Sequence, residues 1–225
     1  MSMNIIDHIR LLLRQAATIP KEKQARFFKV GAGDYAAHDQ FIGVPVPAIR
    51  AIAREYKQLG LADLELLIQS PFNEERLLAL IIVVHQYQKA TGAVQEKLYQ
   101  WYLRNSAYVN NWNLVDSSAH LIIGAHLLGR DRSILSSLAQ SSVLWERRIA
   151  IVATWYFIRH DDLACTYKIA ELLLSDTHDL IHKAVGWMLR EAGKKDQASL
   201  VAFLERYRTK MPRIMYRYAI ERLHS

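Results

Sequence analysis

The stretch Asn110-Asn-Trp-Asn-Leu-Val-Asp-Ser-Ser-Ala-His-Leu-Ile-Ile-Gly-Ala-His-Leu-Leu128 begins with polar residues and continues as an apolar helical run. Trp112, Asp116 and His120 recur every four residues, so a helix would stack them along one face. A carboxylate inside so apolar a run needs a partner or a polar opening. Asp116 is therefore either a functional carboxylate beside an aromatic ring, or a structural one stabilised by the helix dipole.

The same helical periodicity extends along the chain, and no segment has the pattern of a strand. It predicts helices at 4–17, 21–28, 47–56, 64–69, 74–89, 94–104, 111–128, 133–139, 143–159, 163–174, 179–191, 198–207 and 212–223. Pro47 is expected to open one of these helices, and Asp63 and Asn73 to cap two others. Antiparallel helix pairs that recur about every 35–45 residues indicate HEAT-like repeats. We predict one all-α domain, residues 1–225, a superhelical solenoid with a concave face.

Residues 29–46 interrupt the helical pattern. Three glycines lie in this segment, Gly31, Gly33 and Gly43, and they indicate irregular backbone. A long ordered loop is often functional. The segment is not a phosphate-binding loop, because Gly31 and Gly33 lack the third glycine and no Lys-Ser/Thr pair follows.

Composition restricts the possible chemistry. The net charge is +7, and from residue 180 onward ten Lys/Arg oppose four acids. Such a basic region suits a polyanion such as nucleic acid, although a solvated basic face is the alternative. The nine histidines show no metal-binding spacing, and the one cysteine, Cys165, excludes an intramolecular disulfide. We therefore expect no metal and no cofactor.

No apolar run is long enough to span a bilayer, and no signal peptide is evident. We expect a cytoplasmic or nucleoid-associated monomer without membrane contact.

Three further stretches carry candidate binding residues. Arg147 and Arg148 lie in the first turn of helix 143–159, where the dipole disfavours cations unless an anion is near. In helix 179–191, Gly186 suggests close approach of another backbone. In the same helix, Lys183, Trp187 and either Arg190 or Glu191 share a face by spacing. In helix 212–223, Arg213 and Arg217 alternate with tyrosines, a pattern that suits a sugar-phosphate backbone. A core role for Trp187 and solvated-surface roles for the cations are the alternatives.

Four motifs together resemble the AlkD-like DNA alkylation repair proteins. These are Asn-Asn-Trp-x-Leu-Val-Asp, Leu-Trp-Glu-Arg-Arg-Ile-Ala, His-Lys-Ala-Val-Gly-Trp-Met-Leu-Arg-Glu and Met-Pro-Arg-x-Met-x-Arg-Tyr-Ala-Ile-Glu, and they occur here in this order. Phe27-Phe-Lys, Asp39-Gln-Phe-Ile-Gly-Val and Pro47-x-x-Arg50 extend the similarity toward the N-terminus. The resemblance covers about residues 20–224.

The resemblance implies HEAT-like repeats wrapped around double-stranded DNA, and in glycosylase members the excision of cationic N3- and N7-alkylpurines without a metal or cofactor. It places the catalytic carboxylate at Asp116, the aromatic residues flanking the lesion at Trp112 and Trp187, and a DNA-contacting arginine at Arg148. Asn113 departs from the family, which often has Asp there.

A second departure concerns activity. Glycosylase members have a full second helix that contacts the lesion, and we expect residues 31–37 to take the place of most of it here. We therefore keep three hypotheses: an alkylpurine DNA glycosylase, a non-catalytic binder of damaged, distorted or branched DNA, and a helical scaffold for protein interactions.

Overall fold

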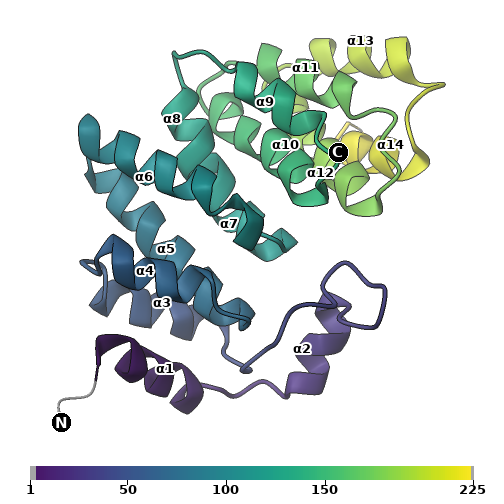
Figure 1. Ribbon diagram of the computed structural model, residues 1–225. Coiled ribbons are helices and arrows are strands. Elements are labelled where there is room, and N and C mark those ends of the chain that lie inside the picture. Colours follow the sequence, from purple (N-terminus) through teal and green to yellow (C-terminus); the bar gives the residue numbers. More distant parts are fainter. Residues whose placement is uncertain (1–3, 224–225) are drawn as a thin grey trace. The chain divides into compact units, whose positions relative to one another are not determined.

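The computed structural model describes residues 4–223, and the regular elements of this part of the chain are all helices, without a strand (Figure 1). One isolated parallel β-bridge joins Gln40 to Phe72. The predicted all-α class is therefore confirmed. The chain divides into two compact units, Met1–Ser118 and Ala119–Ser225, and each is described by itself.

The first unit is built around one almost fully buried helix, α5 (Asn73–Lys89). Leu78, Ala79, Leu80, Ile82 and Val83 are all fully buried, so the middle of α5 is apolar on every side rather than on one stripe. It packs against α3 (Val46–Glu55), α4 (Leu61–Ile68) and α6 (Ala93–Arg104). The remaining helices of the unit are α1 (Ile5–Gln15), α2 (Lys21–Phe28), the short 3-10 turn η1 (Ser106–Tyr108) and α7 (Trp112–Ala119).

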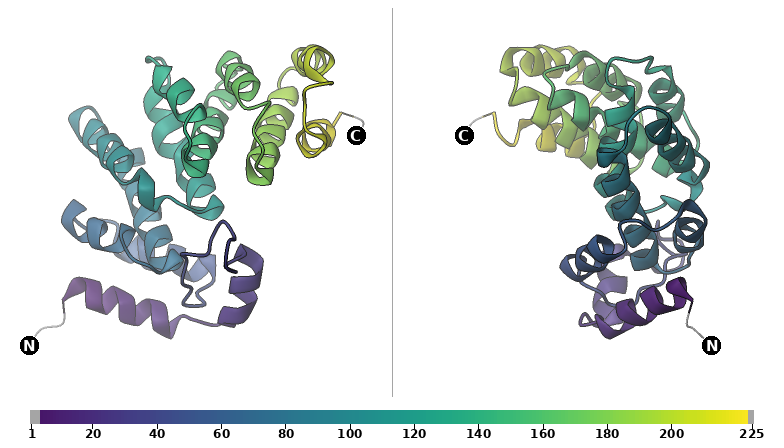
Figure 2. Two further views of the ribbon diagram at one scale, coloured as in Figure 1. Left: turned by 45° about the vertical axis from the view of Figure 1, so that its right-hand side comes forward. Right: turned by 90° about the vertical axis from the view of Figure 1, so that its left-hand side faces the viewer.

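The second unit also has a central helix, α10 (Leu144–Ile158), which packs against most of the other helices of the unit (Figure 2). These neighbours are the π-helical turn η2 (His120–Gly124), α8 (Ala125–Leu127), α9 (Ser133–Ala139), α11 (Ala164–Leu172) and α12 (Asp179–Gly193). On its other side α12 packs against α13 (Gln197–Tyr207) and α14 (Arg213–Ile220).

Two predicted helix caps are wrong, and Pro47 is the second residue of α3 rather than the first. The helix predicted to begin at residue 64 begins three residues earlier: α4 starts at Leu61, with Gly60 at the N-cap and Asp63 in its first turn. Asn73 does not cap α5; Phe72 occupies that position without a side-chain hydrogen bond. The side chain of Asn73 is instead bound by other polar side chains, which a local capping rule cannot foresee.

Two glycines allow helices to approach closely within the second unit. A methyl group at Gly186 on α12 would lie 2.5 Å from the carbonyl oxygen of Met215 and 2.5 Å from Cβ of Tyr218, both on α14. At Gly124, a methyl group would lie 2.2 Å from the carbonyl oxygen of Ala153 on α10. The expected backbone contact at Gly186 is confirmed, and the helix pair α12–α14 depends on it.

Within residues 4–223 no helix combines the length and the apolarity that a bilayer crossing requires.

Replacing Gly186 with alanine should destabilise the protein by about 1–3 kcal/mol, because the added methyl group overpacks the α12–α14 contact. Urea unfolding would measure the loss. Gly60→Ala is the control, since a methyl group there meets only Asp63 Oδ2 at 3.9 Å. Equal unfolding midpoints for the two variants would contradict the assigned role of Gly186.

Candidate functional site

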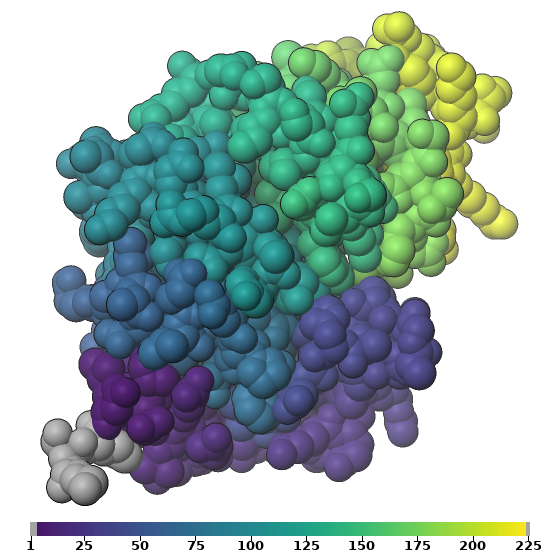
Figure 3. All heavy atoms as spheres, viewed as in Figure 1, coloured from purple at the N-terminus to yellow at the C-terminus, as the bar shows by residue number. Residues whose placement is uncertain are grey.

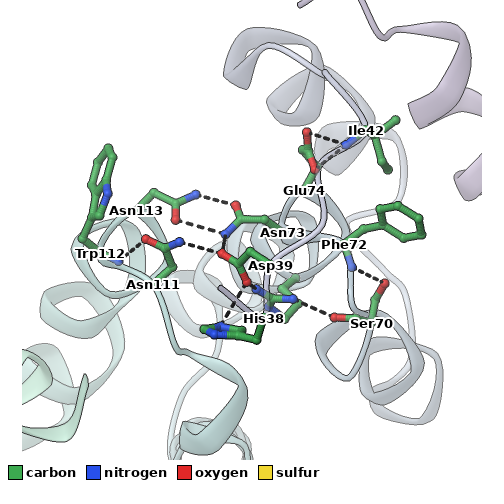
Figure 4. Close-up of polar contacts among 11 residues, drawn as sticks. His38, Asp39, Ile42, Ser70, Phe72, Asn73, Glu74, Asn111, Trp112 and Asn113 are labelled. Atoms are coloured by element: carbon green, nitrogen blue, oxygen red, sulfur yellow. Dashed lines mark hydrogen bonds and ion pairs between the residues drawn. The ribbon is translucent and has the colours of Figure 1, made fainter. Parts of the chain in front are cut away.

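A buried carboxylate, Asp39, joins three separate segments of the first unit (Figure 4). Its side chain is fully buried and pairs with the guanidinium of Arg76. Asn73 donates a hydrogen bond of 2.9 Å and Asn111 one of 2.6 Å to Oδ2, while His38 Nε2 lies 3.1 Å from Oδ1. These donors offset the cost of removing a charge from water.

Arg76 fixes this carboxylate to the start of α5. One guanidinium nitrogen donates to the Ser70 carbonyl oxygen at 2.8 Å, while another contacts Asp39. Ser70 Oγ in turn accepts from the amide of Phe72 at 3.1 Å. The residues that introduce α5 are therefore held by the same charged pair.

The network continues into the start of α7, which carries two of the predicted site residues. Asn111 donates to Asp39 and accepts a hydrogen bond of 2.7 Å from the backbone amide of Trp112. Beside it, the Asn113 amide donates to Asn73 Oδ1 at 2.7 Å. Asn111 thus satisfies one of the free amides at a helix start and couples α7 to the buried carboxylate.

A second buried carboxylate, Glu74, holds the irregular segment. Its oxygens accept hydrogen bonds from the backbone amides of Ile42, Gly43 and Val44 at distances of 2.9 to 3.3 Å. Residues 29–45 contain no helix, and the outer turn of the segment lies on the surface (Figure 3). The segment is therefore a loop whose end, Ile42 to Val44, is anchored by a side chain of α5, while turns within residues 31–39 have their own backbone hydrogen bonds.

An aromatic cluster lies against Trp112. Phe28, at the end of α2, stacks on the indole with ring centres 5.2 Å apart, and Phe27 meets it edge-on at 5.7 Å. Phe41 from the loop stacks on the other side of the cluster, 4.7 Å from Phe28. Phe27 is 66% exposed. The cluster fixes the orientation of Trp112 and places an apolar ring at the surface next to it.

Asp116 follows Trp112 by one helical turn and is half-buried. It lies close enough to Tyr102 for its charge to act on the phenol. Burial is the main cause that raises the pKa of Tyr102 above its ordinary value; the hydrogen bond with Ser118 lowers it, and the charge of Asp116 raises it. Tyr102 and Ser118 are 3.0 Å apart between their hydroxyl oxygens.

The two predicted arginines of the second unit have partners within that unit. Arg147 forms an ion pair of 2.6 Å with Asp176 and donates to the carbonyl oxygens of Ser141 and Ser142, each at 3.0 Å. Arg148 is buried and donates to the Leu180 carbonyl oxygen at 2.5 Å. The expectation of an anion near the start of this helix is met for Arg147 by a carboxylate.

Trp187 lies in an aromatic row of the second unit. Its ring centre is 5.0 Å from that of Trp155, which lies 4.5 Å from that of His120. Trp155 is half-buried. The half-buried indoles of Trp155 and Trp187 are therefore in contact, and the buried imidazole of His120 lies against Trp155.

The remaining predicted cations differ in exposure. Lys183 is half-buried on α12, while Arg190 pairs with Glu221 and, at 3.4 Å, with Glu191. Arg213 and Arg217, both on α14, are exposed, and the guanidinium of Arg217 lies 5.9 Å from the ring centre of Tyr218. These two arginines are available to an external anion.

Sequence reasoning missed the polar network. Asn111 stands in the quoted stretch and Asp39 in one of the compared motifs, yet nothing in their spacing shows that they meet across 72 residues. Among residues 4–223, no group of three or more His, Cys, Asp or Glu side chains could hold a metal ion.

Comparison with known proteins identifies the family. The family model described as DNA alkylation repair enzyme matches residues 9–223. The chain belongs to this family. A solved structure described as a predicted DNA alkylation repair enzyme from Enterococcus faecalis matches with a TM-score of 0.71 and 17% identity, over 90% of this chain and 94% of that chain. This likeness shows that the DNA alkylation repair fold is shared. The search of curated proteins gave no match.

Asp39→Asn should destabilise this DNA alkylation repair protein by about 3–5 kcal/mol, since Arg76 would be left buried without its counter-charge. Thermal and urea unfolding would measure the effect. Asp34→Asn is the matched control, because Asp34 is an exposed residue of the same loop that accepts from Gly31 at 3.1 Å. A stability loss no larger than that of the control would contradict the role given to Asp39.

Proposed function

We propose that this protein is a DNA glycosylase that hydrolyses the N-glycosidic bond of cationic N3- and N7-alkylpurines in double-stranded DNA. The observation that carries the proposal is the half-buried carboxylate of Asp116, one helical turn after Trp112 on a helix whose start is tied to buried Asp39. A fixed carboxylate beside an indole suits a reaction that develops positive charge. Membership of the DNA alkylation repair family supports the same reading.

The chemistry requires little from the protein. An alkylated purine already carries a positive charge, so the bond electrons move to the base as the glycosidic bond breaks. The sugar gains oxocarbenium character, which the Asp116 carboxylate would stabilise. A water molecule then adds to C1′ and loses a proton, leaving the neutral alkylpurine and an abasic site.

The charge of the chain supports DNA as the partner. Ten Lys/Arg against four Asp/Glu leave a net +6 from residue 180 onward. Arg213 and Arg217 are exposed there. We assign these two to the phosphate backbone, with Trp112 and Trp187 as further DNA contacts, while a DNA contact of the buried Arg148 stays a prediction from the sequence. The HEAT-like solenoid with a concave DNA-binding face, and the roles of Arg147, Lys183 and Arg190, stay predictions from the sequence.

One observation favours a second candidate, a non-catalytic binder of damaged, distorted or branched DNA. Residues 29–45 form a loop held by Glu74 instead of extending the second helix, and α2 ends at Phe28. A protein without a longer helix there would bind DNA through the same cations and aromatic rings and leave the base attached.

Asp116→Asn should abolish base release while DNA binding is kept, because the variant removes the charge and keeps the size of the side chain. Methylated duplex DNA would be incubated with each protein, and free 3-methyladenine and 7-methylguanine measured. Losing one electrostatic contact of this kind costs about 100- to 1,000-fold in rate. Asp7→Asn, on α1, is the control and should release bases like the parent protein.

The outcomes separate the two candidates. Base release that disappears with Asp116→Asn supports the glycosylase. No release by the parent protein, together with tighter binding of distorted than of plain duplex at the same salt concentration, supports the non-catalytic binder. Release that is equal in Asp116→Asn removes the role proposed for this carboxylate.

Arg213→Gln combined with Arg217→Gln should weaken duplex binding and make it less sensitive to salt. Each phosphate contact contributes a slope of about 0.9 in a plot of log K against log salt concentration, so the double variant should lose about 2. Fluorescence anisotropy at several salt concentrations measures this slope. Arg159→Gln with Lys168→Gln removes the same charge from exposed positions and should keep the slope.

A further inference from the structure

Two adjoining hollows lie on the first unit and share His85. The larger, of about 650 Å³, is bounded by the turn between α3 and α4, the end of α5 and the start of α6. The smaller, of about 170 Å³, lies beside α3. Their lining includes no acidic side chain from the described residues and is rich in cations: Arg50, Arg54, Lys57, Lys89 and Lys97.

The walls of the larger hollow are held together by side-chain amides. Gln86 donates to the carbonyl oxygens of Lys57 at 3.0 Å and Leu59 at 2.9 Å, which ties α5 to the α3–α4 turn. Gln95 donates to the carbonyl oxygen of Tyr87 at 3.4 Å, which ties α6 to α5. The hollow is therefore a built feature of three connected elements.

The lysines at its rim lack internal counter-charges. In the part of the chain that the structure describes, Lys57, Lys89 and Lys97 are exposed and form no ion pair, whereas Arg10 of the same unit pairs with Glu75 at 3.1 Å. Cations gathered without acids repel one another and favour a bound anion. A multiply charged anion would satisfy more than one of them.

The hollow also has an apolar part. Leu59 and Leu98 are buried in its wall, and Val94 is 56% exposed at its edge. Its volume lies in the range of about 300–1,000 Å³ that small-molecule sites occupy. An apolar surface next to cations suits a ligand with a flat ring and phosphates.

We propose that this hollow is a second binding site, separate from Asp116, for a phosphorylated nucleoside. Lys57, Lys89 and Lys97 bind the phosphates, and the base lies against Val94 and the buried leucines. The nucleotide is either free or the 5′-phosphorylated end of a DNA strand. Both sources present the same chemistry to the hollow.

Calorimetric titration of the full chain tests the proposal with two probes, adenosine 5′-diphosphate and a 5′-phosphorylated single-stranded octanucleotide. The triple variant Lys57→Gln, Lys89→Gln, Lys97→Gln should weaken binding about tenfold or more, since three charged contacts are lost. Lys21→Gln, Lys23→Gln, Lys168→Gln is the matched control, since it removes the same charge from exposed lysines outside the hollow, and it should bind like the parent protein.

Val94→Glu places a carboxylate among the lysines at an exposed position and should also weaken binding, while Val94→Ala should retain most of it. Asp116→Asn should bind both probes normally, which keeps this test independent of the glycosylase proposal. Binding of the diphosphate alone assigns a free nucleotide, and binding of the octanucleotide alone assigns a strand end if the Lys57, Lys89, Lys97 variant loses it. Equal binding by the parent and the Lys57, Lys89, Lys97 variant overturns the site, as does the absence of binding by either probe.

Discussion

The buried charge of Asp39 imposes the strongest constraint on the first unit. A carboxylate that is fully removed from water must be neutralised and hydrogen-bonded, and Arg76, Asn73 and Asn111 do this from two different helix starts. Because these partners come from α5 and from the residue before α7, satisfying one charge fixes the loop, α5 and α7 relative to one another. The position of Trp112 follows from that arrangement.

This constraint also explains how an irregular loop can be ordered. Residues 29–45 make few backbone hydrogen bonds to one another, and Glu74 supplies acceptors for three consecutive amides instead. Phe28 then stacks on the indole of Trp112, and Phe41 stacks on Phe28. Asp116 lies one turn after Trp112 on α7 and is half-buried. The residues that hold the loop and the start of this helix, Asp39, Glu74 and Phe28, are themselves buried.

The cations of the second unit fall into two groups, those paired with a carboxylate of the same unit and those exposed to solvent. Arg147 and Arg190 pair with carboxylates of their own unit, while Arg213 and Arg217 remain exposed. A cation with an internal partner mainly shapes the protein, and an exposed one can meet a polyanion. On the first unit, Lys57, Lys89 and Lys97 are exposed cations of this kind. Their exposure is the basis of the second binding site that we propose.

The helical class, most helix positions and the close contact at Gly186 could be predicted from the sequence, because periodicity and glycine act over a few residues. The motifs were also enough to indicate the family. The Asp39 network could not be foreseen, since its members are 34 to 72 residues apart and ordinary polar residues in isolation. Only the tertiary structure decided that Asn73 binds Asp39 instead of capping a helix, because a carboxylate removed from water requires hydrogen-bond donors from the side chains that surround it.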